Sequence, residues 1–224
     1  MRSVIWERPE PGRRRVVPLS RERIVATAVA LADAEGIDAV TLRRVAAELG
    51  TGPMRLYGYL DSKDDLLDLM VDEICGRIPL PEPGPGWRHD VRILAQNTQL
   101  TARRHPWYVT LAGRHPLYGP NGLRYTERLF AAVSRAGLDA RATVVAVNAV
   151  TAYIVGFLQL ELLNVPLGGP EPRPSDERLA YLARALATGA YPALARLFAE
   201  LTPIPAEEVF ADGLERVLDG VAGA

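Results

Sequence analysis

The sequence predicts an all-α fold in which an N-terminal three-helix helix-turn-helix domain precedes a larger helical domain. Apolar residues recur three and four positions apart along most of the chain, as amphipathic helices require. Serine, threonine, glycine and proline stand where such helices would begin and end. The segment PLPEPGPG, residues 79–86, cannot continue a helix and marks a domain boundary. We therefore expect one domain over residues 20–78 and a second over residues 87–224.

The first helix follows residues 1–19, an arginine- and proline-rich segment that we interpret as a flexible arm. Ser20 is a typical N-cap, and Gly36 is a typical residue for ending a helix. Between them a single apolar stripe recurs at helical spacing, formed by Ile24, Ala28, Leu31 and Ala32. This helix should bury one face.

The second helix is capped by Thr41 and ends at Gly50. Its apolar positions share one face, which leaves Arg43 and Arg44 outside; they are Leu42, Val45, Ala46 and Leu49. A third, short helix begins at the pair Gly52-Pro53. We expect two of its side chains to pack inward, Met54 and either Leu56 or Tyr57. The groups that stay available outside are those of Arg55, Tyr57 and Tyr59.

Ser62 caps a fourth helix, with Asp65 in the capping-box position three residues later. The second and third helices, joined by a tight glycine turn, have the spacing of a helix-turn-helix. In that motif the second helix enters a DNA major groove about 12 Å wide. An ordinary helical hairpin with a solvated charged face is the alternative that spacing leaves open.

Beyond the boundary we predict seven more helices and no strand. They span residues 87–105, 107–112, 121–136, 139–163, 175–187, 191–201 and 205–221, with a mobile loop at 164–174. The segment 143–163 is long and apolar enough to cross a bilayer. It contains Asn148, Gln159 and Glu161 and lacks an adjacent basic cluster, so we interpret it as a helix buried between protein layers or subunits. A membrane span is the alternative.

Composition is typical of a soluble globular protein, with 48% hydrophobic residues, 24% charged residues and a net charge of −1. Residues 1–60 carry ten arginines and seven acidic residues, a balance of +3, and the rest of the chain carries −4. Electrostatics therefore favours an N-terminal site for a polyanionic partner. Cys75 is the single cysteine and is interpreted as a buried thiol. Without a signal peptide or a disulfide, we expect a cytoplasmic protein.

Residues 19–74, LSRERIVATAVALADAEGIDAVTLRRVAAELGTGPMRLYGYLDSKDDLLDLMVDEI, resemble without a gap the DNA-binding domain of the TetR (tetracycline repressor) family of bacterial transcriptional regulators. The later segments RHPWYVTLAGRHPLYGPNGL, AVNAVTAYIVGFLQLEL, YPALARL and FADGLERVLDGV resemble the ligand-binding and dimerisation domain of the tetracycline-repressor type. The resemblance implies a ligand-responsive regulator, a repressor by the habit of the family. Its partners would be a pseudo-palindromic DNA operator, a small-molecule effector and a second copy of itself.

The resemblance also assigns DNA contacts by position. Arg43 and the start of the third helix would face bases, and the other residues would contact phosphates. The full set is Thr41, Arg43, Arg44, Pro53, Met54, Arg55, Tyr57, Tyr59 and Lys63. Gly58, Tyr59 and Leu60 depart from the residues that the family often carries there, so the operator sequence cannot be carried over. Arg13, Arg14 and Arg15 could reach an adjacent minor groove, or belong to a solvated tail.

For the effector, polar and aromatic side chains on mainly apolar helices are the candidates. They are Trp107, Tyr108, Thr110, Tyr118, Asn148, Thr151 and Gln159. Thr110 stands where the tetracycline repressor has a magnesium-chelating histidine, and the three histidines of the chain form no ligand cluster. We therefore predict no metal, no cofactor and no magnesium–tetracycline effector.

The dimer contact is expected on the helices at 139–163 and 205–221, through a wide apolar stripe. Its residues are Tyr153, Gly156, Phe157, Val209, Phe210, Gly213, Leu214 and Val217. The same positions could instead form only the core of one chain. A rival function is a helical small-molecule carrier without DNA binding. An enzyme is not expected, because no catalytic triad, phosphate-binding loop or paired-carboxylate motif has recognisable spacing.

Overall fold

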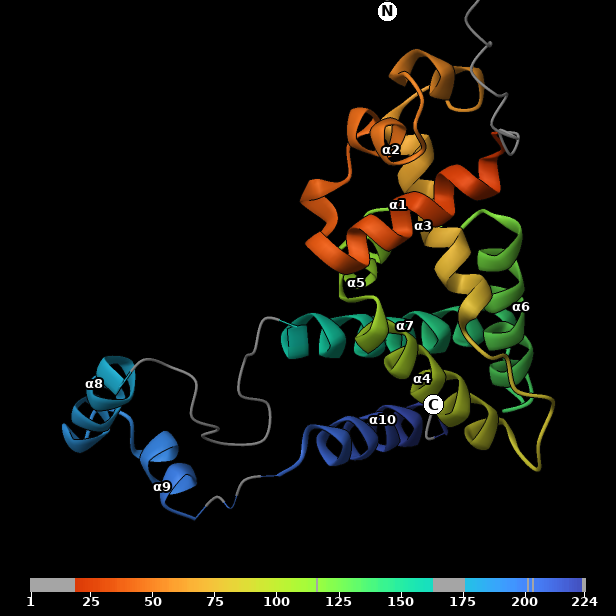
Figure 1. The fold of residues 1–224 in the computed structure, drawn as a ribbon. Helices are drawn as coiled ribbons and strands as arrows, with labels where there is room; N and C mark the ends of the chain where they lie inside the picture. The colour runs from red at the N-terminus through yellow and green to blue at the C-terminus, as the bar shows by residue number, and fades with distance from the viewer. Residues whose placement is uncertain (1–18, 116, 163–175, 201, 203, 223–224) are drawn as a thin grey trace, which may run out of the picture.

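The computed structural model describes residues 19–115, 117–162, 176–200, 202 and 204–222, and every regular element in these segments is helical (Figure 1). The all-α prediction is confirmed. In chain order the elements are α1 (Arg21–Glu35), η2 (Ile37–Ala39), α2 (Leu42–Glu48), η3 (Pro53–Gly58), α3 (Lys63–Arg77), α4 (Trp87–Arg104), α5 (Pro106–Ala112), α6 (Pro120–Ser134), α7 (Ala140–Leu162), α8 (Asp176–Ala187), α9 (Pro192–Glu200) and α10 (Ala206–Ala222), where η denotes a 3-10 helix.

Side-chain caps fix where the N-terminal helices begin. The hydroxyl oxygens of Ser20, Thr41 and Ser62 each accept a hydrogen bond from the backbone N–H three residues on, at 3.3, 3.1 and 3.1 Å. Each bond satisfies a donor that has no partner within the first helical turn. The caps at these three residues are therefore confirmed.

Helix α3 connects the N-terminal helices to the rest of the chain. It packs against α1 at one end and runs down beside α6 at the other (Figure 1). Its inner face, which includes Leu66, Met70 and Ile74, is fully buried. Buried residues of both halves belong to one continuous hydrophobic cluster. A displacement of α3 would therefore alter side-chain packing in both halves.

The second half is built on α4, α6 and α7, with α10 lying along α7 (Figure 1). Ion pairs tie α4 to its neighbours. The Arg92 guanidinium forms a bidentate pair with Glu215 of α10, and Arg103 binds Glu161 of α7 at 2.6 Å and Glu207 of α10 at 2.8 Å. Bidentate pairs of this kind fix orientation as well as distance.

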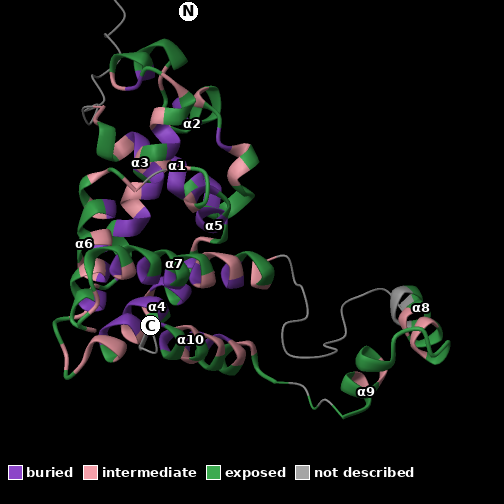
Figure 2. Ribbon diagram, turned by 180° about the vertical axis from the view of Figure 1, so that it is seen from behind, coloured by how far each residue is buried: buried purple, intermediate pink, exposed green. Residues whose placement is uncertain are grey.

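Two features leave apolar surface uncovered. Helix α7 is the one helix in the described residues that is long and apolar enough to cross a membrane. Only 39% of its most apolar window is buried in this chain, so much of its apolar surface is exposed. Helices α8 and α9 stand apart from the other helices (Figures 1 and 2), and α9 has no buried residue. Tyr181, Leu194 and Leu197 on this pair are exposed.

The predicted helix ends beyond residue 86 agree with the structure to within two residues. The third helix differs in kind, because the six residues after Gly52 form a 3-10 helix with i→i+3 hydrogen bonds, such as the one from the Arg55 N–H to the Gly52 carbonyl. Leu56 packs inward as expected, whereas the expectation for Met54 is wrong, since its side chain is 79% exposed. The arm before Leu19 and the predicted loop at 164–174 lie outside the described residues.

Candidate nucleic-acid interface and effector site

The element η3 presents the residues that the sequence predicts to face DNA bases. Gly50, with a φ of +66°, ends α2 in a conformation that favours glycine and turns the chain toward η3. Leu56 is completely buried and anchors the short helix from below. The side chains at the start of η3 consequently project outward, as expected for residues that contact DNA bases; they are Pro53, Met54 and Arg55.

The basic residues around η3 differ in whether their charged groups have partners within the protein. Arg43, Arg55 and Lys63 are exposed, and their charged groups have no ion pair or hydrogen bond within the described part of the chain. Arg44 is exposed as well, but it pairs with Glu35 at 2.7 Å and with Glu48 at 3.4 Å. A phosphate would have to compete with these two carboxylates for Arg44, so the first three cations are the better placed for DNA.

Two predicted phosphate contacts already have hydrogen-bond partners inside the protein. The Thr41 hydroxyl oxygen accepts the Arg44 N–H at 3.1 Å, which leaves its own proton free to donate. The Tyr59 hydroxyl instead donates to the Leu19 carbonyl at 2.9 Å, so its one proton is taken. Arg21 Nε donates to the Tyr59 carbonyl at 3.0 Å. Tyr59 thus fastens the start of α1 to the end of η3, a role that sequence spacing did not reveal.

Tyr57 is the better candidate of the two tyrosines for DNA. Its side chain is 49% exposed and lies on the same short element as Met54 and Arg55. Arg13, Arg14 and Arg15 of the predicted arm lie outside the described residues.

Three aspartates of the N-terminal helices bind the second half of the chain, two of them at the segment that surrounds α5. Asp33 of α1 accepts from Trp107 Nε1 at 2.6 Å and lies 2.8 Å from His105 Nδ1. Asp68 of α3 lies 2.6 Å from His115 Nδ1. These contacts, together with those of Asp72 at the start of α6, join the N-terminal helices to the second half through carboxylates, which no sequence pattern indicated.

A cavity of about 370 Å³ lies beside the end of α5 and the end of α7. Two of the predicted effector residues, Thr110 and Gln159, line it. Among the described residues, the sequence interpretation missed three that also line it, Gly113, Arg114 and Leu162. Its walls are partly apolar with a few polar groups, as in many small-molecule sites.

The other predicted effector residues lie elsewhere. Trp107 and Tyr108 are buried, and the Tyr108 hydroxyl lies 3.4 Å from the Cys75 sulfur. Burial raises the pKa of the Tyr108 hydroxyl well above its usual value and also raises the pKa of the Cys75 thiol, so both groups stay protonated near neutral pH. Tyr118 is 80% exposed, and Asn148 and Thr151 lie on the outer face of α7.

Several predicted dimer residues belong to the core of one chain. Phe157, Phe210 and Leu214 are buried between α7 and α10, which is the alternative that the sequence left open. The Tyr153 hydroxyl donates to the Phe210 carbonyl at 2.8 Å, and a Cβ at Gly213 would overlap the Tyr153 ring, so glycine permits this close approach. Gly156, Val209 and Val217 are partly exposed. No group of metal-ligating side chains occurs among the described residues.

Two sequence families match the chain in agreement with this architecture. Residues 24–70 match the tetR family of bacterial regulatory proteins, and residues 80–224 match the tetracyclin repressor-like C-terminal domain. The second match alone covers more than half of the chain. This protein belongs to the TetR family. Its members are DNA-binding transcriptional regulators that respond to ligands and are not enzymes, which confirms the class of function predicted from the sequence.

Individual TetR proteins are similar over most of the chain. The HTH-type transcriptional repressor DrrR1 of Streptomyces coeruleorubidus is 34% identical, over 97% of this chain and 83% of that protein. The tetracycline repressor protein class D of Escherichia coli is 28% identical, over 74% of this chain and 77% of its own length. The crystal structure of the TetR family protein ActR of Streptomyces coelicolor with actinorhodin superposes with a TM-score of 0.79 at 27% identity, covering 93% of this chain and all of ActR.

Proposed function

We propose that this TetR protein is a cytoplasmic, homodimeric repressor that leaves a pseudo-palindromic operator when a small molecule binds its second domain. The observation that carries the DNA part is the cluster of exposed residues around η3. Arg43 on α2, Arg55 on η3 and Lys63 at the start of α3 are exposed like Met54 and Tyr57, and their cations are unpaired within the described residues. The alternative of an ordinary helical hairpin does not account for these unpaired cations.

We assign base contacts to Arg43 and to the start of η3, and phosphate contacts to Thr41, Tyr57 and Lys63. Lys63 is the first residue of α3, so a phosphate there would also lie near the positive end of that helix. Arg44 and Tyr59 take a smaller share, because their polar groups already have partners in the protein. The arm at residues 1–19 adds a minor-groove contact through its three consecutive arginines.

The second copy is proposed to cover the outer face of α7. Val145 is 63% exposed, and the residues at its helical neighbours Asn148, Ala149 and Ala152 are exposed as well. Small and apolar side chains at this spacing allow two helices to approach closely. Two symmetric copies would then place two η3 elements on successive major-groove faces. This division assigns residues 20–78 to DNA and residues 87–224 to effector binding and dimerisation.

We place the effector in the cavity at Thr110 and Gln159. Helix α5 carries Thr110 into this cavity and Trp107 against Asp33, so occupancy can reach the DNA-facing helices over a short distance. The ActR crystal structure with actinorhodin shows a small-molecule complex of a structurally similar protein and supports a small-molecule effector here. The effector can shift the DNA-binding equilibrium only by its difference in affinity between the two states.

Selection of random duplex DNA by the purified protein at moderate salt tests this function. An inverted repeat among the retained sequences is the expected result and would also give the half-site spacing. The carrier alternative predicts that nothing specific is retained. Replacing both Arg43 and Arg55 by alanine should abolish retention while the thermal unfolding midpoint stays unchanged, because neither guanidinium has a protein partner in the described residues.

A further inference from the structure

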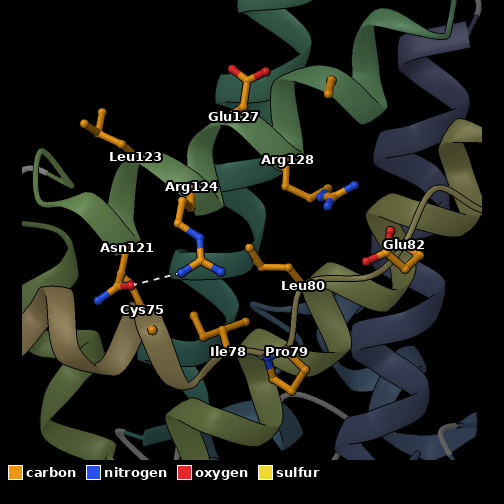
Figure 3. A pocket seen from close by; sticks show the side chains of 12 residues that line it. Cys75, Ile78, Pro79, Leu80, Glu82, Asn121, Leu123, Arg124, Glu127 and Arg128 are labelled. Carbon is orange, nitrogen blue, oxygen red and sulfur yellow. Dashed lines mark hydrogen bonds between the residues drawn. The ribbon is translucent and has the colours of Figure 1, made fainter.

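A groove of about 850 Å³ lies between α6, the end of α3 and the connection that follows it (Figure 3). Its volume falls within the range typical of small-molecule sites. It shares no lining residue with the cavity at Thr110 and Gln159. Helix α6 lies on the opposite side of the molecule from the C-terminal end of α7, which lines that cavity (Figure 1), so the groove is separate from the proposed effector site.

The wall formed by the connection between α3 and α4 is fixed at both ends. At one end, Asn97 Nδ2 donates to the Pro79 carbonyl at 2.7 Å. At the other, the Gly84 N–H donates to Asp90 at 2.8 Å, and Arg135 donates to both Asp90 (2.6 Å) and the Gly84 carbonyl (3.0 Å). Asp90 is itself buried. The groove is therefore preformed, which lowers the ordering cost of binding.

Its floor is apolar and its α6 side is cationic. Ile78 is buried at the base, and Leu80 and Leu123 flank it. Arg124 and Arg128, one turn apart on α6, extend from the helix into the groove region, Arg124 between Asn121 and Leu80 (Figure 3). Neither guanidinium forms an ion pair with any described residue, and Arg124 has one long hydrogen bond, 3.5 Å, to Asn121 Oδ1.

We propose that this groove binds a small molecule that carries a single anionic group on an apolar body. The two unpaired guanidinium groups supply strong, directional donors for a carboxylate or sulfonate, and the apolar floor covers the body. Glu82 and Glu127 also line the groove and are exposed. With Arg124 and Arg128 they bring the formal charge of the groove to zero, which favours a ligand with one anionic group over a polyanion.

An occupant would act on the junction between the two halves. Cys75 and Gly76 of α3 and Asn121 of α6 all line the groove. Asn121, together with Gly122, is also where Asp72 holds α6 to α3. A bound molecule would therefore bridge α3, the connection and α6. The binding itself does not depend on the proposed DNA function.

Two fluorescent probes that differ in one group test the site in the full chain. 8-Anilinonaphthalene-1-sulfonate carries an anion on an aromatic body, and N-phenyl-1-naphthylamine is the same body without it. The variant R124Q/R128Q should bind the sulfonate about tenfold more weakly and the neutral probe as the wild type does. The control R141Q/R216Q removes two exposed arginines outside the groove and should change neither affinity.

A second pair of variants locates the binding. L123E places a carboxylate in the groove wall and should weaken both probes, whereas Q159A in the other cavity should weaken neither. Equal sulfonate affinity in R124Q/R128Q and wild type, or loss in Q159A in place of L123E, would overturn the proposal. Thermal unfolding of every variant confirms folding. Because the readout contains no DNA, a failure of DNA binding in the selection experiment leaves this outcome untouched.

Discussion

Asp72 of α3 holds Asn121 at the start of α6 with both carboxylate oxygens. One oxygen accepts the Asn121 backbone N–H at 3.0 Å, and the other accepts its side-chain amide at 3.1 Å. The first oxygen also accepts the Gly122 N–H at 2.8 Å. A carboxylate from one helix thus caps another, and two unpaired N–H groups of α6 find their acceptor in the DNA-facing half of the protein.

Breaking this contact should lower stability. D72A removes the cap and should lower the free energy of unfolding by about 1–2 kcal/mol. G119A should do the same from the other side, because a Cβ at Gly119 would overlap the Asp72 carboxyl group. The matched control is G86A, since Gly86 also precedes a helix and a Cβ there meets nothing. Urea unfolding measures all three, and an unchanged midpoint in both D72A and G119A would refute the assignment.

The exposed Met54 predicts a thymine at a defined position of each half-site. Met54 is 79% exposed on the element that we propose enters the major groove, where an apolar side chain can contact a thymine methyl group. Replacing that thymine by deoxyuridine in the selected operator should weaken wild-type binding by about 0.8 kcal/mol, the value of one methyl-sized group. M54A should bind both operators equally. A penalty that persists in M54A would assign the methyl contact to another residue.

The two tyrosines of this region should respond differently to loss of the hydroxyl. Y59F leaves the Leu19 carbonyl without its donor and should cost about 1 kcal/mol of stability in the absence of DNA. Y57F should leave stability unchanged, because the Tyr57 hydroxyl has no hydrogen bond within the described residues, but it should weaken operator binding. Paired urea unfolding and filter-binding measurements check both. The reverse pattern would exchange the proposed roles.

A charge on the outer face of α7 should dissociate the dimer. V145E would bury an unpaired carboxylate at the proposed interface, so dimer affinity should fall at least about tenfold. L100E is the control, because Leu100 is 53% exposed on α4, outside the proposed interface. Sedimentation across a concentration series reports the change. A V145E protein that remains dimeric would place the interface elsewhere.

The predicted arm at residues 1–19 should contribute to operator binding through its positive charge alone. Deletion of residues 1–17 removes Arg13, Arg14 and Arg15 and should make the salt dependence of operator binding shallower. The slope should fall by about 0.9 for each DNA phosphate that the arm neutralises in the full chain. Alanine at these three positions should reproduce the effect. An unchanged slope in both proteins would mean that the arm does not contact DNA.

Local signals made the fold predictable from the sequence. Ser20, Thr41 and Ser62 cap helices wherever such residues precede an apolar stripe, because a cap needs only the backbone three residues away. Gly36 and Gly50 end helices through their own positive φ angles. The same locality explains why the helix ends beyond residue 86 were predicted closely.

The candidate site was predictable in part. The residue pattern places Arg43 and Arg55 outside their helices, and the resemblance to the TetR family adds Lys63; the structure exposes all three. Spacing assigned Met54 to the wrong side, because in a helix of only six residues the buried position is set by the neighbouring helices, and Leu56 takes it. Of seven predicted effector residues, two line the cavity at the end of α5.

The sequence by itself determined the helical class, the order and ends of the helices and the basic character of the DNA-facing end, since these depend on residues close together along the chain. Tertiary structure alone decided which polar groups remain free. The Tyr59 hydroxyl donates a hydrogen bond to a carbonyl 40 positions away, and the Asp72 carboxylate caps a helix that begins 48 residues later. Phe210 lies in the core of its own chain because α10 packs on α7. Pairings over such separations are fixed by packing, which no local pattern encodes.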